Sequence, residues 1–148
     1  MQTECQGGFL ISKIKHLSGR IFARMLKEHG IEINPAQGRI MFVLWQYDAI
    51  PIRTLALETG LGKSTLTSML DHLEVSGFIV RERSDMDRRV ILVKRTDKDR
   101  AWQSRYEQVS REMTEIYYAG LSSAEIEGFE QTLNKILSNL AGQEPRLP

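Results

Sequence analysis

A glycine turn between two short amphipathic segments limits most strongly how this chain can fold. The turn, Gly60-Leu61-Gly62, separates a segment from Ile52 to about Thr59 from one that runs from Lys63 to about Ser76. Apolar residues recur at helical spacing in both segments, so we expect two helices joined tightly, because glycine tolerates the positive φ that such turns need. On its own, this pattern fits an ordinary all-α packing arrangement equally well.

The second of these helices has two faces of different chemistry. We expect its apolar face to be buried, and that face contains Leu66, Met69, Leu70 and Leu73. The outer face is small and polar, and it contains Ser64, Thr65, Thr67, Ser68, Asp71 and His72. Serine and threonine are middling helix formers, so their concentration on one face favours a contact role over simple exposure.

A hairpin with a charged tip follows directly. Residues 78–83 are predicted to be extended, residues 84–88 to form a polar turn, and residues 89–93 to return as an apolar strand. Helix, glycine turn, helix and hairpin in this order form a winged helix-turn-helix. Its second helix enters the major groove of DNA, and arginines of its wing meet the more negative minor groove.

Amphipathic helices flank this unit on both sides. Asn34, Pro35 and Gln37 have the pattern of a capped helix start, and Ser122 with Glu125 forms a second capping box. Apolar stripes predict a helix from Leu10 to about Glu28, one after Thr96 that ends near Gly120, and one that continues to Leu140. The expected fold class is therefore mainly α with a small β-hairpin wing.

Five short segments of the chain match a known family of regulators: Leu55-Ala56, Ser64-Thr65-Leu66-Thr67, Leu73-Glu74, Gly77-Phe78-Ile79 and residues 85–89. Through these residues the sequence resembles the MarR family, named for multiple antibiotic resistance. The resemblance implies one domain over residues 1–148, with a DNA-binding lobe at 34–96 and dimerisation helices at 9–33 and 121–141, together with part of 97–120. It also implies a homodimer that binds a palindromic operator. We expect this homodimer to act as a repressor.

The chain departs from the family pattern after the wing. The family usually has Leu-Thr, two variable residues and Gly, whereas this chain reads Arg95-Thr96-Asp97-Lys98-Asp99. The threonine cap is kept, but an arginine replaces an apolar contact and the glycine is absent. We therefore carry over no packing details at this corner, where Lys94 or Arg95 is a candidate for an added phosphate contact.

The expected DNA contacts fall into three groups. The recognition helix is expected to place Ser64, Thr65, Thr67 and Ser68 at base edges and phosphates. Arg88 or Arg89 is expected in the minor groove, with its guanidinium directed by a salt bridge to Asp87. Phosphate contacts that set register are expected from Arg53, Lys63 and Arg81.

A small aromatic or anionic effector is a further expectation from the resemblance, because family members commonly bind such compounds between the dimerisation helices and the DNA-binding lobe. In this chain, aromatic rings would stack on the compound and cations would meet a carboxylate. The candidate residues are His16, Arg20, Trp45 and Tyr106, for which ordinary core and rim packing is the alternative interpretation.

Other classes of function find little support in the sequence. Cys5 is the single cysteine, which suits a reducing cytoplasm; a redox-responsive regulator that acts through it remains an alternative. The histidines are dispersed, so no metal and no cofactor is expected, and no paired carboxylates or nucleophile with a base suggest an enzyme. No segment suits a membrane span. A winged-helix module that binds a protein would instead need apolar or acidic anchors on the recognition face.

Overall fold

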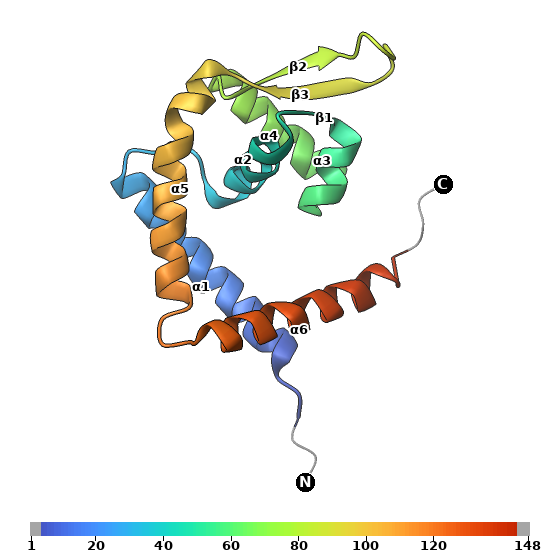
Figure 1. The fold of residues 1–148 in the computed structure, drawn as a ribbon. Helices are drawn as coiled ribbons and strands as arrows, with labels where there is room; N and C mark the ends of the chain where they lie inside the picture. Colours follow the sequence, from blue (N-terminus) through green and yellow to red (C-terminus); the bar gives the residue numbers. More distant parts are fainter. Residues whose placement is uncertain (1–3, 145–148) are drawn as a thin grey trace. The chain divides into compact units, whose positions relative to one another are not determined.

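The structure is mainly helical, and three short strands lie in the middle part of the chain. This computed structural model describes residues 4–144, so residues 1–3 and 145–148 of the expected 1–148 domain lie outside the description. Its elements, shown in Figure 1, are α1 Gly7–Glu28, α2 Pro35–Tyr47, β1 Ala49–Pro51, α3 Ile52–Thr59, α4 Lys63–Val75, β2 Ile79–Arg83, β3 Ile91–Arg95, α5 Asp97–Tyr117 and α6 Ser123–Ala141. The predicted class, mainly α with a small wing, is confirmed.

Local hydrogen bonds explain where two of the helices begin. The Asn34 side chain accepts from the Gln37 backbone N–H at 2.8 Å, and the Gln37 side chain accepts from the Asn34 N–H at 3.1 Å. Ser122 and Glu125 make the same reciprocal pair at 3.1 Å in each direction. Both predicted capping boxes are confirmed, and each satisfies backbone donors that the first turn of a helix leaves unpaired.

The sheet has one strand more than the predicted hairpin. Its order is β1-β3-β2, with both pairings antiparallel, so β3 lies in the centre. The added strand is β1 at residues 49–51, and a strand of three residues is too short to show alternation in the sequence. The returning strand covers residues 91–95 instead of 89–93, because Val90 still belongs to the turn and donates to the Asp87 carbonyl at 2.9 Å.

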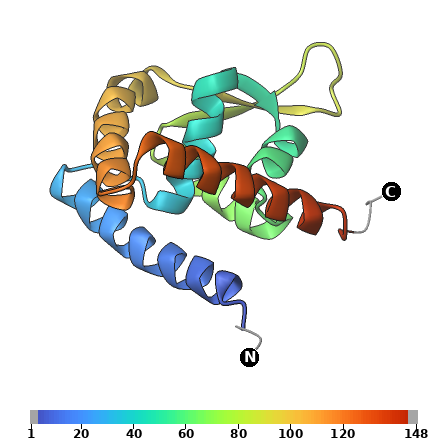
Figure 2. The ribbon, with the colours of Figure 1, turned by 60° about the horizontal axis from the view of Figure 1, so that its bottom comes forward.

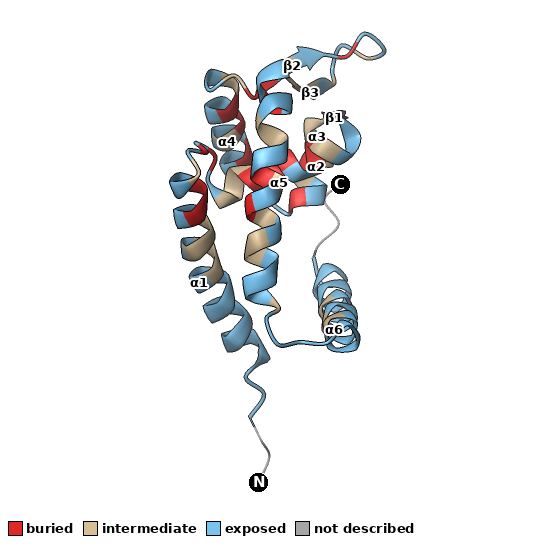
Figure 3. Cartoon of the chain, turned by 60° about the vertical axis from the view of Figure 1, so that its left-hand side comes forward, coloured by how far each residue is buried: buried red, intermediate tan, exposed pale blue. Residues whose placement is uncertain are grey.

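One core lies beneath this sheet and joins it to the recognition helix. Leu66, Leu70 and Leu73 of α4 are at most 1% exposed, while Met69 is only half-buried. They are buried together with Phe78, which precedes β2, and with residues of α2, α3 and the sheet that include Met41, Leu44, Leu55, Ile79 and Val93. Each fully buried aliphatic side chain stabilises the fold by about 1.5–3 kcal/mol, so α4 is held firmly by its inner face. Figure 3 shows this buried region in red.

The chain divides into two compact units, Met1–Arg111 and Glu112–Pro148, with the boundary inside α5. In the first unit, the turn between β2 and β3 projects beyond the helices, as Figures 1 and 2 show. In the second unit, none of the residues of α6 is buried. None of the helices in the described part of the chain is long and apolar enough to cross a membrane.

Candidate nucleic-acid interface

The polar face of α4 is fully open. Ser64, Thr65, Thr67, Ser68, Asp71 and His72 are all exposed, while the opposite face of the helix is buried. The Thr67 hydroxyl donates to the Lys63 carbonyl at 2.9 Å, so its proton is used within the helix while its oxygen can still accept a hydrogen bond. A face of short acceptors and donors on a firmly packed helix suits the major groove, which admits one α-helix.

The start of α4 is also favourable to a phosphate. The turn before it uses a left-handed residue at Gly60, with φ of 69°, whereas Gly62 has an ordinary φ of −66°. Gly62 caps the helix without a side-chain hydrogen bond, and the first turn contains no acidic residue. Its first backbone N–H groups therefore face outward beside the exposed Lys63, where the helix dipole favours an anion.

The tip of the wing is ordered by its own hydrogen bonds. The Ser84 hydroxyl is buried and accepts from the backbone N–H groups of Met86 at 3.2 Å and Asp87 at 3.4 Å. Arg83 Nη1 donates to the Arg88 carbonyl at 2.9 Å, which ties the base of the turn to its tip. The sequence alone does not indicate these roles of Ser84 and Arg83, because their hydrogen bonds form only in the folded turn.

Arg89 is exposed, and Asp87 directs it. Its Nε donates to Asp87 Oδ1 at 3.1 Å, and its Nη2 donates to Oδ2 at 3.1 Å. These side-chain bonds, followed by the bond from the Arg89 backbone N–H, hold the pKa of the Asp87 carboxyl below its usual value. The salt bridge expected from the sequence is therefore present. Arg88 is also exposed and approaches Asp85 only loosely, at 3.8 Å.

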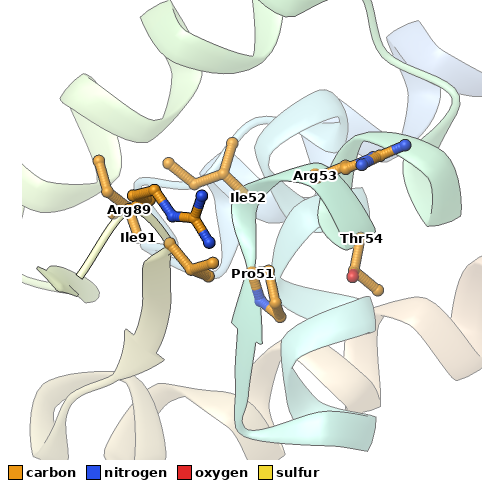
Figure 4. A pocket seen from close by; sticks show the side chains of 7 residues that line it. Pro51, Ile52, Arg53, Thr54, Arg89 and Ile91 are labelled. Carbon is orange, nitrogen blue, oxygen red and sulfur yellow. The ribbon is translucent and has the colours of Figure 1, made fainter. Parts of the chain in front are cut away.

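Arg53 lies near the wing although 36 residues separate it from Arg89 in the sequence. A hollow of about 480 Å³ between the start of α3 and the wing is lined by Pro51, Ile52, Arg53, Thr54, Arg89, Val90 and Ile91. Figure 4 shows the two arginine side chains extending from different elements around this hollow. Cations from α3 and from the wing thus border one concave surface, which can receive phosphates of a nucleic-acid backbone.

Arg81 has internal partners that the sequence did not indicate. Its Nη2 donates to Asp71 and its Nε donates to Glu74, both at 2.6 Å. These bonds, the one to Asp71 first, raise the pKa of Arg81 above its ordinary value. The guanidinium joins β2 to α4 and neutralises the acidic side chain on the recognition face. The phosphate contact expected for Arg81 stays a prediction.

Arg95 corrects one expectation. We expected Lys94 or Arg95 to supply an added phosphate contact, but the Arg95 side chain is only 9% exposed and pairs with the buried Asp99 at 2.6 Å. Its guanidinium is thus inside the protein and cannot reach a phosphate. Lys94 lies nearer the surface and pairs with Glu82 at 2.8 Å, which raises the pKa of its ammonium.

The four effector candidates lie in two different surroundings. His16 and Arg20 line a shallow hollow on α1 together with Phe9, Ser12, Lys13 and Leu17. Trp45 and Tyr106 do not line that hollow: their rings pack edge to face at 5.0 Å, and Tyr106 also packs on Phe22. Tyr106 is 5% exposed, and burial raises its pKa to about 12. Tyr106 therefore belongs to the core, and the half-buried Trp45 packs against it.

Cys5 and the dispersed histidines form no cluster. Cys5 is exposed and precedes α1. Across residues 4–144, no group of three or more His, Cys, Asp or Glu side chains is placed to hold a metal ion. Exposed hydroxyl groups and arginines of the kind that bind DNA are concentrated on α4 and the wing.

Comparison with known proteins agrees with this geometry. Residues 33–91 match the sequence model of the MarR family. The HTH-type transcriptional regulator TtmR of Methylorubrum extorquens (strain PA1) is 30% identical over 92 residues, which are 62% of this chain and 46% of that protein. The chain matches about half the length of TtmR and of other curated relatives.

Solved structures resemble the chain over almost its whole length. A MarR-family regulator from Silicibacter pomeroyi has a TM-score of 0.76 and 26% identity, covering 95% of this chain and 92% of that one. BpsR of Bordetella bronchiseptica, whose DNA binding 6-hydroxynicotinic acid regulates, has a TM-score of 0.81 over 92% of this chain and 97% of its own; at 19% identity this likeness is one of fold. The relatives found are transcriptional regulators, and residues 33–91 of this chain are similar to the MarR family.

Proposed function

We propose that the chain is a sequence-specific DNA-binding repressor that acts in the cytoplasm and binds a pseudo-palindromic operator as a homodimer. One observation carries this proposal: the exposed Ser/Thr face of α4 lies in the same unit as a wing whose tip presents Arg89 in a fixed direction. The helix offers hydrogen-bonding groups of major-groove size, and the wing offers a directed cation for the minor groove.

The assigned contacts divide by chemistry. Ser64, Thr65, Thr67 and Ser68 read base edges, and Arg88 or Arg89 enters the minor groove. Arg53, Lys63 and the first backbone N–H groups of α4 hold phosphates. These contacts fix the register and the salt dependence more than the sequence preference.

Exposed apolar faces support the homodimer. On α1, the large apolar residues Phe9, Leu10, Ile11, Ile14 and Leu17 are exposed, and on α6, Ile136, Leu137 and Leu140 are exposed. Soluble monomers rarely expose such long apolar stripes, and most oligomers close them by two-fold symmetry. A second copy of the chain would cover both faces, and it would place two recognition helices about 34 Å apart, one turn of DNA.

The shallow hollow on α1 suits a small aromatic anion. Lys13, His16 and Arg20 offer positive or neutral donors, and Phe9 offers a ring face. The effector proposal therefore keeps His16 and Arg20, while the half-buried Trp45 and the buried Tyr106 act through packing. Thermal-shift screening with aromatic carboxylates tests it: stabilisation that is lost in Arg20→Ala supports the site, and equal stabilisation of both proteins rejects it.

The DNA proposal is tested by titrating labelled duplexes from the upstream region of the gene against scrambled duplexes over a range of salt. Arg89→Ala should weaken operator binding about tenfold and reduce the salt slope by about one. Arg39→Ala, which removes an exposed charge from α2, is the matched control.

Equal, weak binding of both duplexes would favour the alternative, a winged helix that binds a protein. Operator binding that changes with peroxide in the parent but not in Cys5→Ser would favour the redox alternative.

A further inference from the structure

A buried ionic network lies where the wing joins the rest of the first unit. Arg95, the last residue of β3, donates from Nε to Asp99 in the first turn of α5 at 2.6 Å, and from Nη2 to the Gln103 side chain. Trp45 of α2 donates from its indole nitrogen to the two Asp99 oxygens at 3.0 and 3.2 Å. Asp99 is completely buried. One carboxylate thus connects the wing, α5 and α2.

The other strand of the wing is fastened close by. The Thr96 hydroxyl donates to the Gly77 carbonyl at 2.5 Å, and Lys98 Nζ donates to the Ser76 carbonyl at 2.6 Å. Ser76 and Gly77 lead from the recognition helix into β2. Both strands of the wing are therefore attached at their base to the start of α5.

Stability alone does not account for this arrangement. Moving two charges out of water is costly, and apolar side chains of similar size often stabilise a fold as well or better. The sequence has an arginine at the position where the family pattern has an apolar residue. What an ion pair adds over an apolar contact is direction, because a guanidinium and a carboxylate bind in one plane and in few orientations.

A small change of angle at the base of the wing displaces the residues further along the wing by a larger distance. Four positions separate Arg95 from Ile91 at the other end of β3, and an extended chain rises about 3.3 Å per residue, so this strand is about 13 Å long and Arg89 lies beyond it in the turn. A pivot of about 10° at its base would move the far end of this strand by about 2 Å, several times the roughly 0.5 Å within which a binding group must be held.

We infer that Arg95 and Asp99 are positioning residues for DNA recognition: their buried ion pair, braced by Trp45, fixes the angle of the wing and thereby the place of Arg89. The inference rests on the proposed DNA-binding function. It assigns no contact with DNA to Arg95 or Asp99. It predicts that Arg89 contributes little to operator binding when the pair is absent, even though Arg89 and Asp87 are unchanged.

A double-mutant comparison separates positioning from stability. Arg95→Leu with Asp99→Asn removes both charges together and keeps an acceptor for the Trp45 indole. Arg89→Ala should weaken operator binding about tenfold in the parent protein and less than about twofold in this background. Arg24→Leu with Glu28→Gln is the matched control, because that pair has the same i,i+4 spacing but is exposed on α1. There, Arg89→Ala should keep its full effect.

A second readout needs no DNA. A fluorophore on Met86→Cys, in a Cys5→Ser background, reports motion of the wing tip, because Met86 is 96% exposed. Its residual anisotropy should fall in Arg95→Leu/Asp99→Asn and stay unchanged in the control. If that variant does not fold, Arg95→Lys, which keeps the charge but loses the planar fork, is compared in the same two ways.

The outcomes are distinct. An equal effect of Arg89→Ala in both backgrounds, with an equally rigid tip, overturns the inference and leaves the ion pair a stability element. If Arg89→Ala has no effect even in the parent, the assigned DNA contact of Arg89 is wrong. The anisotropy then decides alone whether the pair fixes the wing: a looser tip supports the inference, and an unchanged tip overturns it.

Discussion

The winged lobe and α6 have the same kind of apolar periodicity but opposite burial. In α4, the apolar face is almost completely buried, whereas Ile136, Leu137 and Leu140 of α6 are 40%, 65% and 62% exposed. Figure 3 shows the contrast in red and pale blue. The comparison teaches that periodicity tells which side of a helix will be covered, while the covering surface can belong to another molecule.

The largest expected effect tests what covers α6. Leu137→Glu with Leu140→Glu should convert the dimer to monomers and abolish operator binding. Full burial of an exposed leucine contributes about 1.5–3 kcal/mol, and these two are already about one third covered, so their loss from both subunits costs about 4–8 kcal/mol of dissociation free energy. Sedimentation velocity over a range of concentrations measures it.

Gln131→Glu adds the same charge to an exposed polar position of α6 and serves as the control. It should leave the dimer intact. A dimer that survives both leucine substitutions would show that the apolar face of α6 is not the subunit interface, and the comparison between the two regions would need another explanation.

A second prediction tests the lobe. Leu70→Ala removes a fully buried side chain of α4 and should lower the free energy of unfolding by about 2–5 kcal/mol. Leu57→Ala, at a position of α3 that is 78% exposed, should change it by less than about 0.5 kcal/mol. Urea denaturation of both variants measures the difference. Similar losses would mean that Leu57 is covered in the folded dimer.

The features that the sequence predicted well depend on chemistry within a few residues. Both capping boxes and the Asp87–Arg89 salt bridge join residues at most three positions apart, so their partners could be named without a fold. The strand at residues 49–51 was missed because its partner, residues 92–94, lies more than 40 residues away.

The errors at the site have the same origin. Arg95 was expected at the surface because its charge is visible in the sequence, whereas its environment is set in part by Trp45, which reaches Asp99 across 54 residues. The fold also supplies internal partners to Arg81 and Tyr106 that the sequence did not indicate, while their assigned contacts with DNA and effector stay predictions. A charged or aromatic side chain is identified easily from sequence, but its use depends on contacts that only the folded chain defines.

A third prediction concerns the close approach of α2 and α5 within the lobe unit. A Cβ atom on Gly38 would lie 1.8 Å from the Tyr106 hydroxyl oxygen, so Gly38→Ala forces the buried ring to move. Overpacking of this kind should lower the free energy of unfolding by about 3 kcal/mol. Urea denaturation tests it, and Tyr106→Leu in the same chain should recover part of the loss. A neutral Gly38→Ala would show that this contact is looser than the structure indicates.

The smallest expected effect compares a tyrosine of each unit at alkaline pH. Burial raises the pKa of Tyr106 to about 12, whereas in the unfolded chain it is close to 10. Between these values the unfolded chain has already lost the proton that the folded chain keeps. The stability contributed by the neutral hydroxyl is therefore complete below pH 10 and is lost as the pH rises to 12, by on the order of 2 kcal/mol.

Tyr106→Phe should flatten the decline of stability between pH 10 and 12, as measured by urea denaturation at each pH. Tyr118 of the second unit is the comparison: its hydroxyl donates to Glu130 at 2.9 Å, and desolvation followed by Glu130 raises its pKa too, but the side chain is closer to solvent. Tyr118→Phe should therefore flatten the decline less. Equal effects of the two substitutions would mean that Tyr118 is as buried in the proposed dimer as Tyr106 is in the first unit. The contrast in burial between the two regions would then hold for the single chain and not for the dimer.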